Sequence, residues 1–182
     1  MLRLQGNLVG LRILKKSDAE VFCPLVADRR VARYLSRLPQ PYHIEDAQAW
    51  VKTTRQQARR RESFSFGIEG QREKAIVGMI SLMEIKWEDG VAELGYWVGR
   101  PYWRRGYAYE AVHFMLRFAF EELKLYRVFA QVLETNKASS NLLRKAGFVP
   151  EGISRKSRFQ NGRRLDMVSF GLLRPEFRPS KS

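Results

Sequence analysis

The sequence predicts one mixed α/β domain built from about seven strands and about four helices. Three observations lead to this fold class. Short apolar runs bounded by glycine, proline, asparagine or aspartate recur along the chain, and such runs are typical of β-strands. Between them lie longer segments whose apolar residues repeat at helical spacing. The 182 residues, 45% of them hydrophobic, suffice for a single domain with a sizeable core.

The first third of the chain is expected to hold one strand and two helices. Residues 7–14 alternate between apolar and polar side chains, which predicts a strand. Ser17 or Asp18 then caps a helix that continues to about Ala27. A second helix is expected over residues 44–61, and its basic end suits the negative end of the helix dipole without any ligand.

The middle of the chain predicts an antiparallel meander followed by a long helix. Strand-like runs over residues 63–70, 75–85 and 91–99 are separated by short turns, as in consecutive hairpins. Residues 109–123 then show helical periodicity in their apolar positions. These positions are Ala111, Val112, Met115, Leu116, Ala119 and Leu123.

The last third predicts a strand, a helix and a closing hairpin. A strand is expected over residues 125–134, after which Asn136 begins a helix that ends at Gly147. Residues 148–159 and 163–173 are the two strands of the hairpin. The whole chain, 1–182, is thus predicted to be one domain, with its core over about 8–173 and a flexible tail over 174–182.

Charge is the unusual bulk property of this chain. The formal net charge is +14, yet residues 63–100 hold four cations against six carboxylates. The excess of lysine and arginine therefore lies before and after an acidic middle. Basic flanks suit a polyanionic partner such as RNA, and they also suit a surface that serves solubility alone. The sequence leaves both interpretations open.

The location expected from the sequence is the cytoplasm. No apolar run approaches the roughly 18 residues that a bilayer span requires, and the first residues alternate instead of forming a secretory signal. The single cysteine, Cys23, cannot form an internal disulfide, which fits a reducing compartment. Cys23 is expected to be a buried, inert thiol.

A tight loop between a predicted strand and the long helix is the first candidate binding site. Gly106 lies where the chain turns into the N-terminus of that helix, so unpaired backbone N–H groups and the helix dipole can bind an anion. Arg104 and Arg105 add positive charge, and the small Ala108 leaves room. The loop matches neither a nucleotide P-loop nor a dinucleotide fingerprint. The alternative is an ordinary glycine turn with solvated arginines.

Two ordered segments then resemble a known family. "ELGYWVGRPYWRRGYAYEAV" followed by "ETNKASSNLLRKAGFVPEG" is similar to the Gcn5-related N-acetyltransferase (GNAT) superfamily, in particular its ribosomal-protein (RimJ/RimL-type) branch. The resemblance covers about Leu8 to Leu173, with Trp103 where the family loop has glutamine or arginine. It implies a mostly antiparallel sheet of about seven strands, splayed at a bulge and flanked by about four helices. The implied function is transfer of acetyl from acetyl-coenzyme A (acetyl-CoA) to a primary amine.

The resemblance also implies which residues bind acetyl-CoA. The loop before the long helix would bind the pyrophosphate, and the pantetheine arm would pair with the exposed backbone of the strand before it. Asn136 stands at the family's cofactor-contacting asparagine. The implied cofactor-binding residues are Tyr96, Trp97, Val98, Arg104, Arg105, Gly106, Tyr107, Ala108 and Asn136.

Two side chains are candidates for proton transfer. The amine must lose a proton before it attacks the thioester, and Glu93, where the family often has an acid, is the candidate base. Ser139 stands at the family position near the cofactor sulfur and is the candidate acid, with Ser140 one residue away. Each has a plainer alternative: Glu93 as a solvent-facing strand residue, and Ser139 as a helix cap or surface residue. No tyrosine follows Asn136, although some relatives use one as the acid.

The acceptor is less well defined by the sequence. The loop "LPQPYHIED", residues 38–46, lies where relatives shape the acceptor pocket, so Tyr34, Leu35 and Tyr42 are expected to line it. A protein N-terminal α-amine, as in a ribosomal protein, is the first expectation. The overall positive charge disfavours a polyamine or an aminoglycoside, but the acidity of residues 63–100 offsets this objection, so both stay open. A non-catalytic ribosome- or RNA-binding protein on the same fold is the alternative from another class.

Neither a metal nor a membrane is implied by this sequence. His43 and His113 lie far apart and without the spacing of a metal-binding motif, so structural or surface roles are expected for both. The chain is expected to be a monomer or a homodimer.

Overall fold

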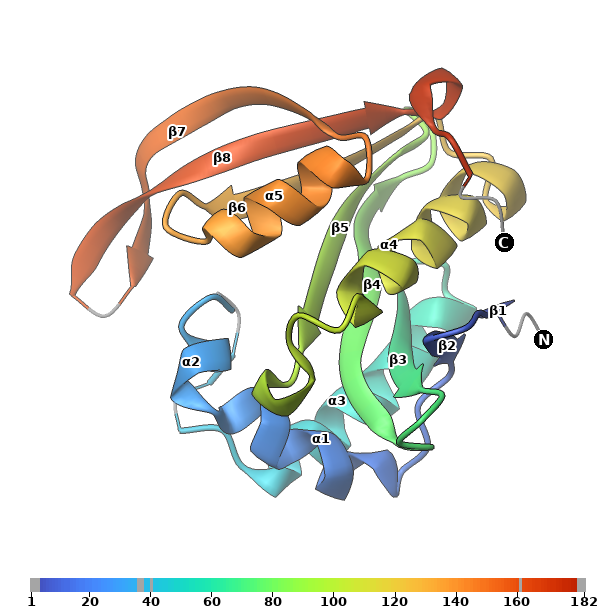
Figure 1. The fold of residues 1–182 in the computed structure, drawn as a ribbon, viewed down its shortest axis with the longest axis vertical. Helices are drawn as coiled ribbons and strands as arrows, with labels where there is room; N and C mark the ends of the chain where they lie inside the picture. The colour runs from blue at the N-terminus through green and yellow to red at the C-terminus, as the bar shows by residue number, and fades with distance from the viewer. Residues whose placement is uncertain (1–3, 36–37, 40, 161, 180–182) are drawn as a thin grey trace.

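The structure, a computed structural model, describes residues 4–35, 38–39, 41–160 and 162–179. Its strands are β1 (Leu4–Gln5), β2 (Val9–Arg12), β3 (Phe64–Gly70), β4 (Ile76–Lys86), β5 (Val91–Val98), β6 (Arg127–Leu133), β7 (Val149–Gln160) and β8 (Arg163–Leu173). In the described part of the chain they form one open sheet of eight strands in the order β1-β2-β3-β4-β5-β6-β8-β7 (Figure 1). Neighbouring strands are antiparallel except β5 and β6, which run parallel.

Helices cover both faces of this sheet. They are α1 (Asp18–Ala27), α2 (Arg29–Ala32), α3 (Ile44–Arg59), α4 (Tyr107–Arg117) and α5 (Lys137–Lys145). Helices α4 and α5 pack on one face, and α1 and α3 pack on the other (Figure 1). The mixed α/β class and the antiparallel meander predicted from the sequence are therefore confirmed.

Two short elements were not expected from the sequence, and the segment after β8 packs on the core. Strand β1 and helix α2 are too short to show a period, so the expected numbers of about seven strands and four helices were low. After β8 the chain forms a 3-10 turn, Arg174–Glu176. Phe177 then packs against Phe120, because a buried aromatic pair is more stable than an exposed one. Residues 180–182 lie outside the described residues.

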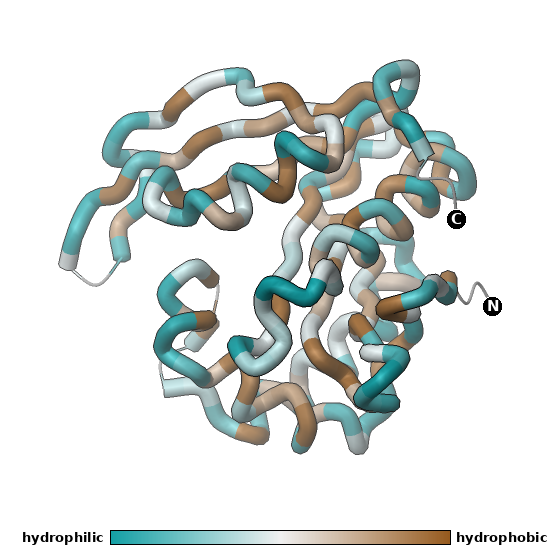
Figure 2. The backbone as a smooth tube through the Cα atoms, viewed as in Figure 1, coloured by the Kyte–Doolittle hydropathy of each residue, from teal (hydrophilic) through white to brown (hydrophobic). Residues whose placement is uncertain are grey.

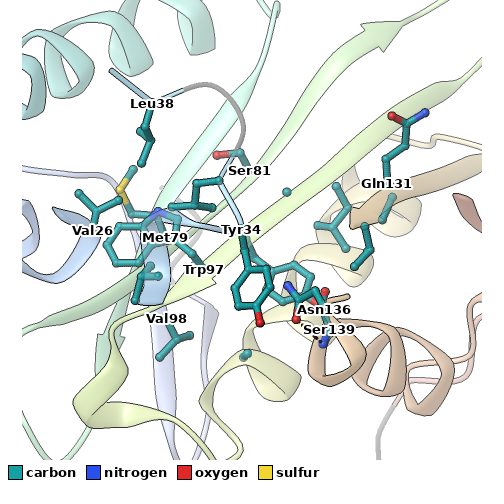
Figure 3. Close-up of a pocket in the computed structure, with 18 of the residues that line it drawn as sticks. Val26, Tyr34, Leu38, Met79, Ser81, Trp97, Val98, Gln131, Asn136 and Ser139 are labelled. Atoms are coloured by element: carbon teal, nitrogen blue, oxygen red, sulfur yellow. Dashed lines mark hydrogen bonds between the residues drawn. The ribbon is translucent and has the colours of Figure 1, made fainter. Parts of the chain in front are cut away.

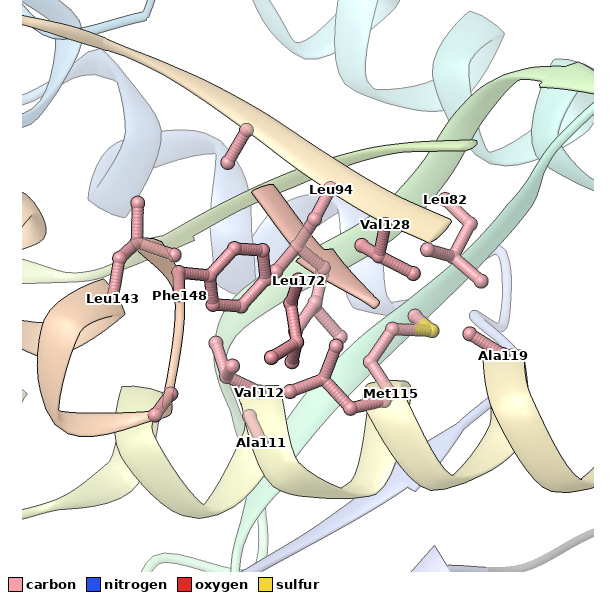
Figure 4. Packing of buried hydrophobic residues seen from close by; sticks show 14 of the residues in the cluster. Leu82, Leu94, Ala111, Val112, Met115, Ala119, Val128, Leu143, Phe148 and Leu172 are labelled. Atoms are coloured by element: carbon pink, nitrogen blue, oxygen red, sulfur yellow. The ribbon is translucent and has the colours of Figure 1, made fainter. Parts of the chain in front are cut away.

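The larger core lies between the sheet and the face covered by α4 and α5. Figure 4 shows Met115 and Val112 of α4 pointing toward the sheet, where Leu82 and Leu94 project from β4 and β5. All four of these side chains are almost completely buried. A second core, which includes Phe22 and Val51, joins α1 and α3 to the opposite face. Packing on both faces holds β4 and β5 in place beneath the candidate site.

Strands β5 and β6 separate after a short parallel pairing. The paired residues run from Val91 with Arg127 to Glu93 with Phe129, and beyond Glu93 the two strands diverge (Figure 1). On the other side of β5, its pairing with β4 shifts register between Met83, which pairs with Glu93, and Lys86, which pairs with Val91. The divergence leaves one side of the second half of β5 without a strand partner. The predicted splay is thus present, and it begins at Glu93.

Glu110 in the first turn of α4 fixes this helix to the start of β2. Its carboxylate accepts hydrogen bonds from the backbone N–H groups of Asn7, Leu8 and Val9, at 3.2, 2.9 and 2.6 Å. Hydrogen bonds to an ionised acceptor are stronger than neutral ones. The contact therefore holds the N-terminus of α4 in position relative to the sheet.

Replacing Glu110 with alanine is expected to lower the free energy of unfolding by about 2 kcal/mol, because three backbone donors lose a charged acceptor. Urea denaturation measures the change. Glu121→Ala is the matched control, since Glu121 is exposed and makes one ion pair, to Arg117 at 3.5 Å. Its loss should cost less than about 0.5 kcal/mol. Equal destabilisation by both variants would contradict the anchoring role of Glu110.

Candidate active site

A cavity of about 1410 Å³ occupies the opening between the diverging strands. The second half of β5 and the loop before α4 line one side, and β6 with the start of α5 lines another. Helices α1, α2 and α3 and the β7–β8 hairpin complete the wall. In Figure 2 the loop before α4 is strongly hydrophilic. A single cavity is thus bordered by every segment in which the sequence predicted a functional residue.

The loop before α4 has the geometry expected of an anion site. Gly106 precedes the first residue of α4 with a left-handed φ of 81°, and Arg104 is also left-handed at 61°. The N–H groups of the first helical turn, beginning at Tyr107, have no carbonyl partner within the helix and carry the positive end of its dipole. The indole Nε1 of Trp103 donates to the Val98 carbonyl at 2.6 Å and closes the loop against β5.

Glu73, which the sequence did not single out, supports this loop from the β3–β4 turn. Its carboxylate accepts a hydrogen bond from the guanidinium of Arg105 at 3.0 Å and from the hydroxyl of the buried Tyr107, also at 3.0 Å. Arg105 is therefore held in an ion pair beside the loop, whereas Arg104 is exposed on the cavity lining. No local sequence pattern connects Glu73 to this loop, because the contact spans more than 30 residues of chain.

The backbone of β5 faces two different neighbours. The carbonyl oxygen of Trp97 lies against Gly78 of β4, so the backbone C=O of Trp97 points away from the opening. In a strand the N–H and C=O of one residue point to the same side, and this side alternates from residue to residue. The N–H and C=O of Tyr96 and of Val98 therefore point away from β4, toward the opening between β5 and β6. The Val98 carbonyl is taken by Trp103. The N–H and C=O of Tyr96 and the N–H of Val98 are therefore the backbone groups that face the opening. Trp97 also borders the cavity, and its ring packs near that of Phe22.

The start of α5 brings two predicted residues to the same place. The side-chain oxygen of Asn136 accepts the backbone N–H of Ser139 at 3.2 Å and caps the helix, as expected. The hydroxyl of Ser139 is hydrogen-bonded to that of Tyr96, with 2.8 Å between the oxygens. Figure 3 shows Asn136 and Ser139 side by side at the cavity. Ser140 is buried, unlike Ser139.

The hydroxyl of Tyr96 is a functional group that sequence reasoning missed, since only its backbone was considered. Burial raises the pKa of Tyr96 to about 12, and the hydrogen bond from Ser139 opposes this only in part. Tyr96 therefore stays protonated at neutral pH and is able to donate a proton. The alternation of side chains along β5 could have indicated that Tyr96 and Trp97 project to opposite faces.

Glu93 lies where the two strands separate. It is the last residue of β5 that pairs with β6, it is half-buried, and its side chain borders the large cavity. Tyr34, Leu35 and Tyr42 border the same cavity from the segment between α2 and α3. Figure 3 shows Tyr34 directed into the cavity. Burial raises the pKa of Tyr42 to about 12, so this phenol is also neutral.

The remaining titratable candidates lie in structural surroundings. His113 is buried between Tyr109 and Phe177, and this burial lowers its pKa. The backbone N–H of His43 donates to the Asp46 carboxylate at the start of α3. Cys23 is half-buried, and burial raises the pKa of its thiol. In the part of the chain that the structure describes, no three histidine, cysteine or acidic residues are grouped as a metal site would require.

The chain matches a protein-family model over most of its length. Residues 9–149 match the acetyltransferase (GNAT) domain family. An uncharacterized N-acetyltransferase of Bacillus subtilis, YoaA, is 30% identical over 172 residues, which cover 94% of this chain and 97% of the relative. The matched residues include β5, the loop before α4, and α5.

Other relatives are named for different acetyl acceptors. The spermidine N(1)-acetyltransferase of Vibrio cholerae is 25% identical over 94% of this chain and 96% of its own length. The [ribosomal protein uS5]-alanine N-acetyltransferase of Escherichia coli is 27% identical over 65% of this chain and 62% of its own. A solved acetyltransferase structure superposes with a TM-score of 0.89 at 26% identity, covering 97% of this chain and 99% of that one. Every described helix is too short or too polar to cross a membrane.

Proposed function

The chain belongs to the GNAT family of N-acetyltransferases, and from this premise we propose that its acceptor is a protein N-terminal α-amine. Acetyl-CoA is the acetyl donor. One observation carries the proposal furthest: a single cavity extends from the N-terminus of α4, past Tyr96 and Ser139, to Tyr34. Donor and acceptor could therefore enter from different sides and meet near Glu93. The acceptor class follows the E. coli relative named for an alanine of ribosomal protein uS5.

The residues present fit acetyl-CoA. The N–H groups after Gly106 would bind the pyrophosphate, because a helix N-terminus that lacks a Cβ at its cap offers close backbone donors to an anion. Arg104 and Arg105 would add charge, with Arg105 positioned by Glu73. The pantetheine amides would pair with the peptide groups of β5 that face the opening. Asn136 and Ala108 border the same cavity.

Proton transfer would be divided between two sides of the cavity. The Glu93 carboxylate would accept a proton from the acceptor ammonium, directly or through a water, and so free the nitrogen lone pair. The nitrogen then bonds to the acetyl carbon as the carbon–sulfur bond breaks. A backbone N–H facing the opening on β5 would stabilise the charge that develops on the carbonyl oxygen. The amide nitrogen would lose its second proton to solvent water, and the hydroxyl of Ser139 would donate its proton to the leaving sulfur. Tyr96 would return a proton to Ser139 and would recover its own from water.

The spermidine relative supports a small polyamine as the second candidate acceptor. Thiol release from acetyl-CoA, measured over N-terminal peptides, spermidine and an aminoglycoside, distinguishes the candidates. Highest kcat/KM with peptides supports the α-amine, and highest kcat/KM with spermidine overturns it. If no acceptor is acetylated while RNA binds tightly and in a salt-sensitive manner, the chain is a non-catalytic RNA-binding protein.

Replacing Tyr96 with phenylalanine is expected to lower kcat about tenfold, because the Ser139 hydroxyl loses the group that would reprotonate it. The pKa of about 12 predicts no loss of wild-type activity from Tyr96 ionisation below pH 10. Steady-state kinetics of Tyr96→Phe, Ser139→Ala and the double variant test the pair. If the two residues act together, the double variant is no slower than the slower single variant. Tyr126→Phe, at an exposed tyrosine, is the control.

A further inference from the structure

A second, smaller cavity adjoins the acceptor end of the active site. Its volume is about 470 Å³, and Tyr34, Leu133 and Thr135 border both cavities. Arg33 and Arg163 border only the smaller one. A molecule that reaches Glu93 past Tyr34 can therefore extend into this second cavity. The donor loop before α4 does not contribute to it.

Two arginines from distant parts of the chain meet at this smaller cavity. Arg33 follows α2, and its guanidinium stacks on the Tyr34 ring at 5.0 Å from the centroid. Arg163 is the first residue of β8 and is exposed. No carboxylate lies against either guanidinium among the residues that the structure describes. A third arginine, Arg158 of the hairpin, is half-buried and borders the large cavity nearby.

Four carboxylates border the large cavity among the residues that the structure describes. Glu93 and Glu84 border it from β5 and β4, and Asp46 and Glu62 border it from α3 and the segment after it. Carboxylates thus border the large cavity, and Arg33 and Arg163 border the smaller cavity that adjoins it. A cationic amine is attracted to the first set, and an oxyanion is attracted to the second. Charges of both signs in this arrangement match a dipolar acceptor.

We propose that the acceptor carries a carboxylate or phosphate close to its amine, and that Arg33 and Arg163 bind this group. The inference rests on the acetyl transfer to an α-amine proposed above, and it narrows the acceptor to peptides with an acidic side chain near the N-terminus. The planar guanidinium binds carboxylates and phosphates through two parallel hydrogen bonds. A polyamine, which carries only positive charge, is a poor ligand for the same pair.

Peptides that differ only in charge test the inference. Hexapeptides with N-terminal alanine carry glutamate, phosphoserine, glutamine or lysine at the third position, and kcat/KM is measured for each. The glutamate peptide is expected to exceed the glutamine peptide about tenfold, with the lysine peptide slowest. The phosphoserine peptide shows which of the two oxyanions binds better. Equal kcat/KM for the glutamate and glutamine peptides overturns the inference and leaves the proposed function intact.

A pair of substitutions locates the effect. In Arg33→Gln/Arg163→Gln the ratio of glutamate to glutamine peptide is expected to fall to about 1. The control, Lys52→Gln/Arg59→Gln, removes the same charge from exposed positions of α3 that border neither cavity, and should keep the ratio. If this ratio of kcat/KM values falls equally in both double variants, long-range attraction causes the preference for the glutamate peptide, and the inference is overturned. Acetyl-CoA binding by calorimetry confirms that each variant is folded. Acetylation of spermidine but of no peptide overturns both the inference and the proposed function.

Discussion

Replacing Glu93 with glutamine is expected to lower kcat/KM for the amine about 100-fold at pH 7, with little change in acetyl-CoA affinity. Glutamine keeps the shape of the side chain at the point where β5 and β6 separate, but it cannot accept a proton. An α-amine has a pKa near 8, so most of the acceptor is protonated at pH 7. Steady-state kinetics with a peptide acceptor and calorimetry with acetyl-CoA measure the two quantities separately.

The pH dependence sharpens this expectation. As the pH rises above about 8, the free amine becomes the major form and no longer needs the base, so the deficit of Glu93→Gln should become smaller. Glu88→Gln, in the exposed turn between β4 and β5, is the control and should behave like the wild type. Full activity of Glu93→Gln at pH 7 would show that Glu93 is not the base. A constant deficit at all pH values would assign it a positioning role instead.

Replacing Gly106 with valine is expected to weaken acetyl-CoA binding about 10- to 100-fold. The φ of 81° is costly for a β-branched residue, and an added Cβ would lie 3.0 Å from the Leu8 side chain. Relief of this strain would turn the first N–H groups of α4 away from the pyrophosphate. Calorimetry with acetyl-CoA and with coenzyme A measures the loss.

Gly162 provides a matched control for backbone strain. It has a similar φ of 73° in the β7–β8 turn, where a Cβ would meet no atom within 4 Å. Gly162→Val should lower the unfolding temperature, as Gly106→Val does, but leave acetyl-CoA affinity unchanged. If both variants lose affinity equally, the loss comes from general destabilisation, and the loop around Gly106 is not the pyrophosphate site.

The sequence by itself determined those features whose causes are local. Apolar periodicity identified the long strands and helices, because an element that is buried on one face has apolar residues at a fixed spacing along the sequence. The cap at Asn136 was predictable for the same reason, since its acceptor and donor are three residues apart. Gly106 could also be identified locally, because a tight turn into a helix favours a residue without Cβ. Strand β1 and helix α2 are too short to carry a repeat, and they were missed.

The tertiary structure alone decided which distant side chains meet. Glu73 reaches Arg105 across 32 positions of sequence, and Tyr96 reaches Ser139 across 43. These pairings depend on strand order, on register and on the short parallel contact between β5 and β6. None of these leaves a pattern in neighbouring residues. The sequence therefore identified the loop before α4 and the GNAT acetyltransferase family, whereas only the fold brought the Tyr96 hydroxyl to Ser139 and placed Arg33 and Arg163 at one cavity.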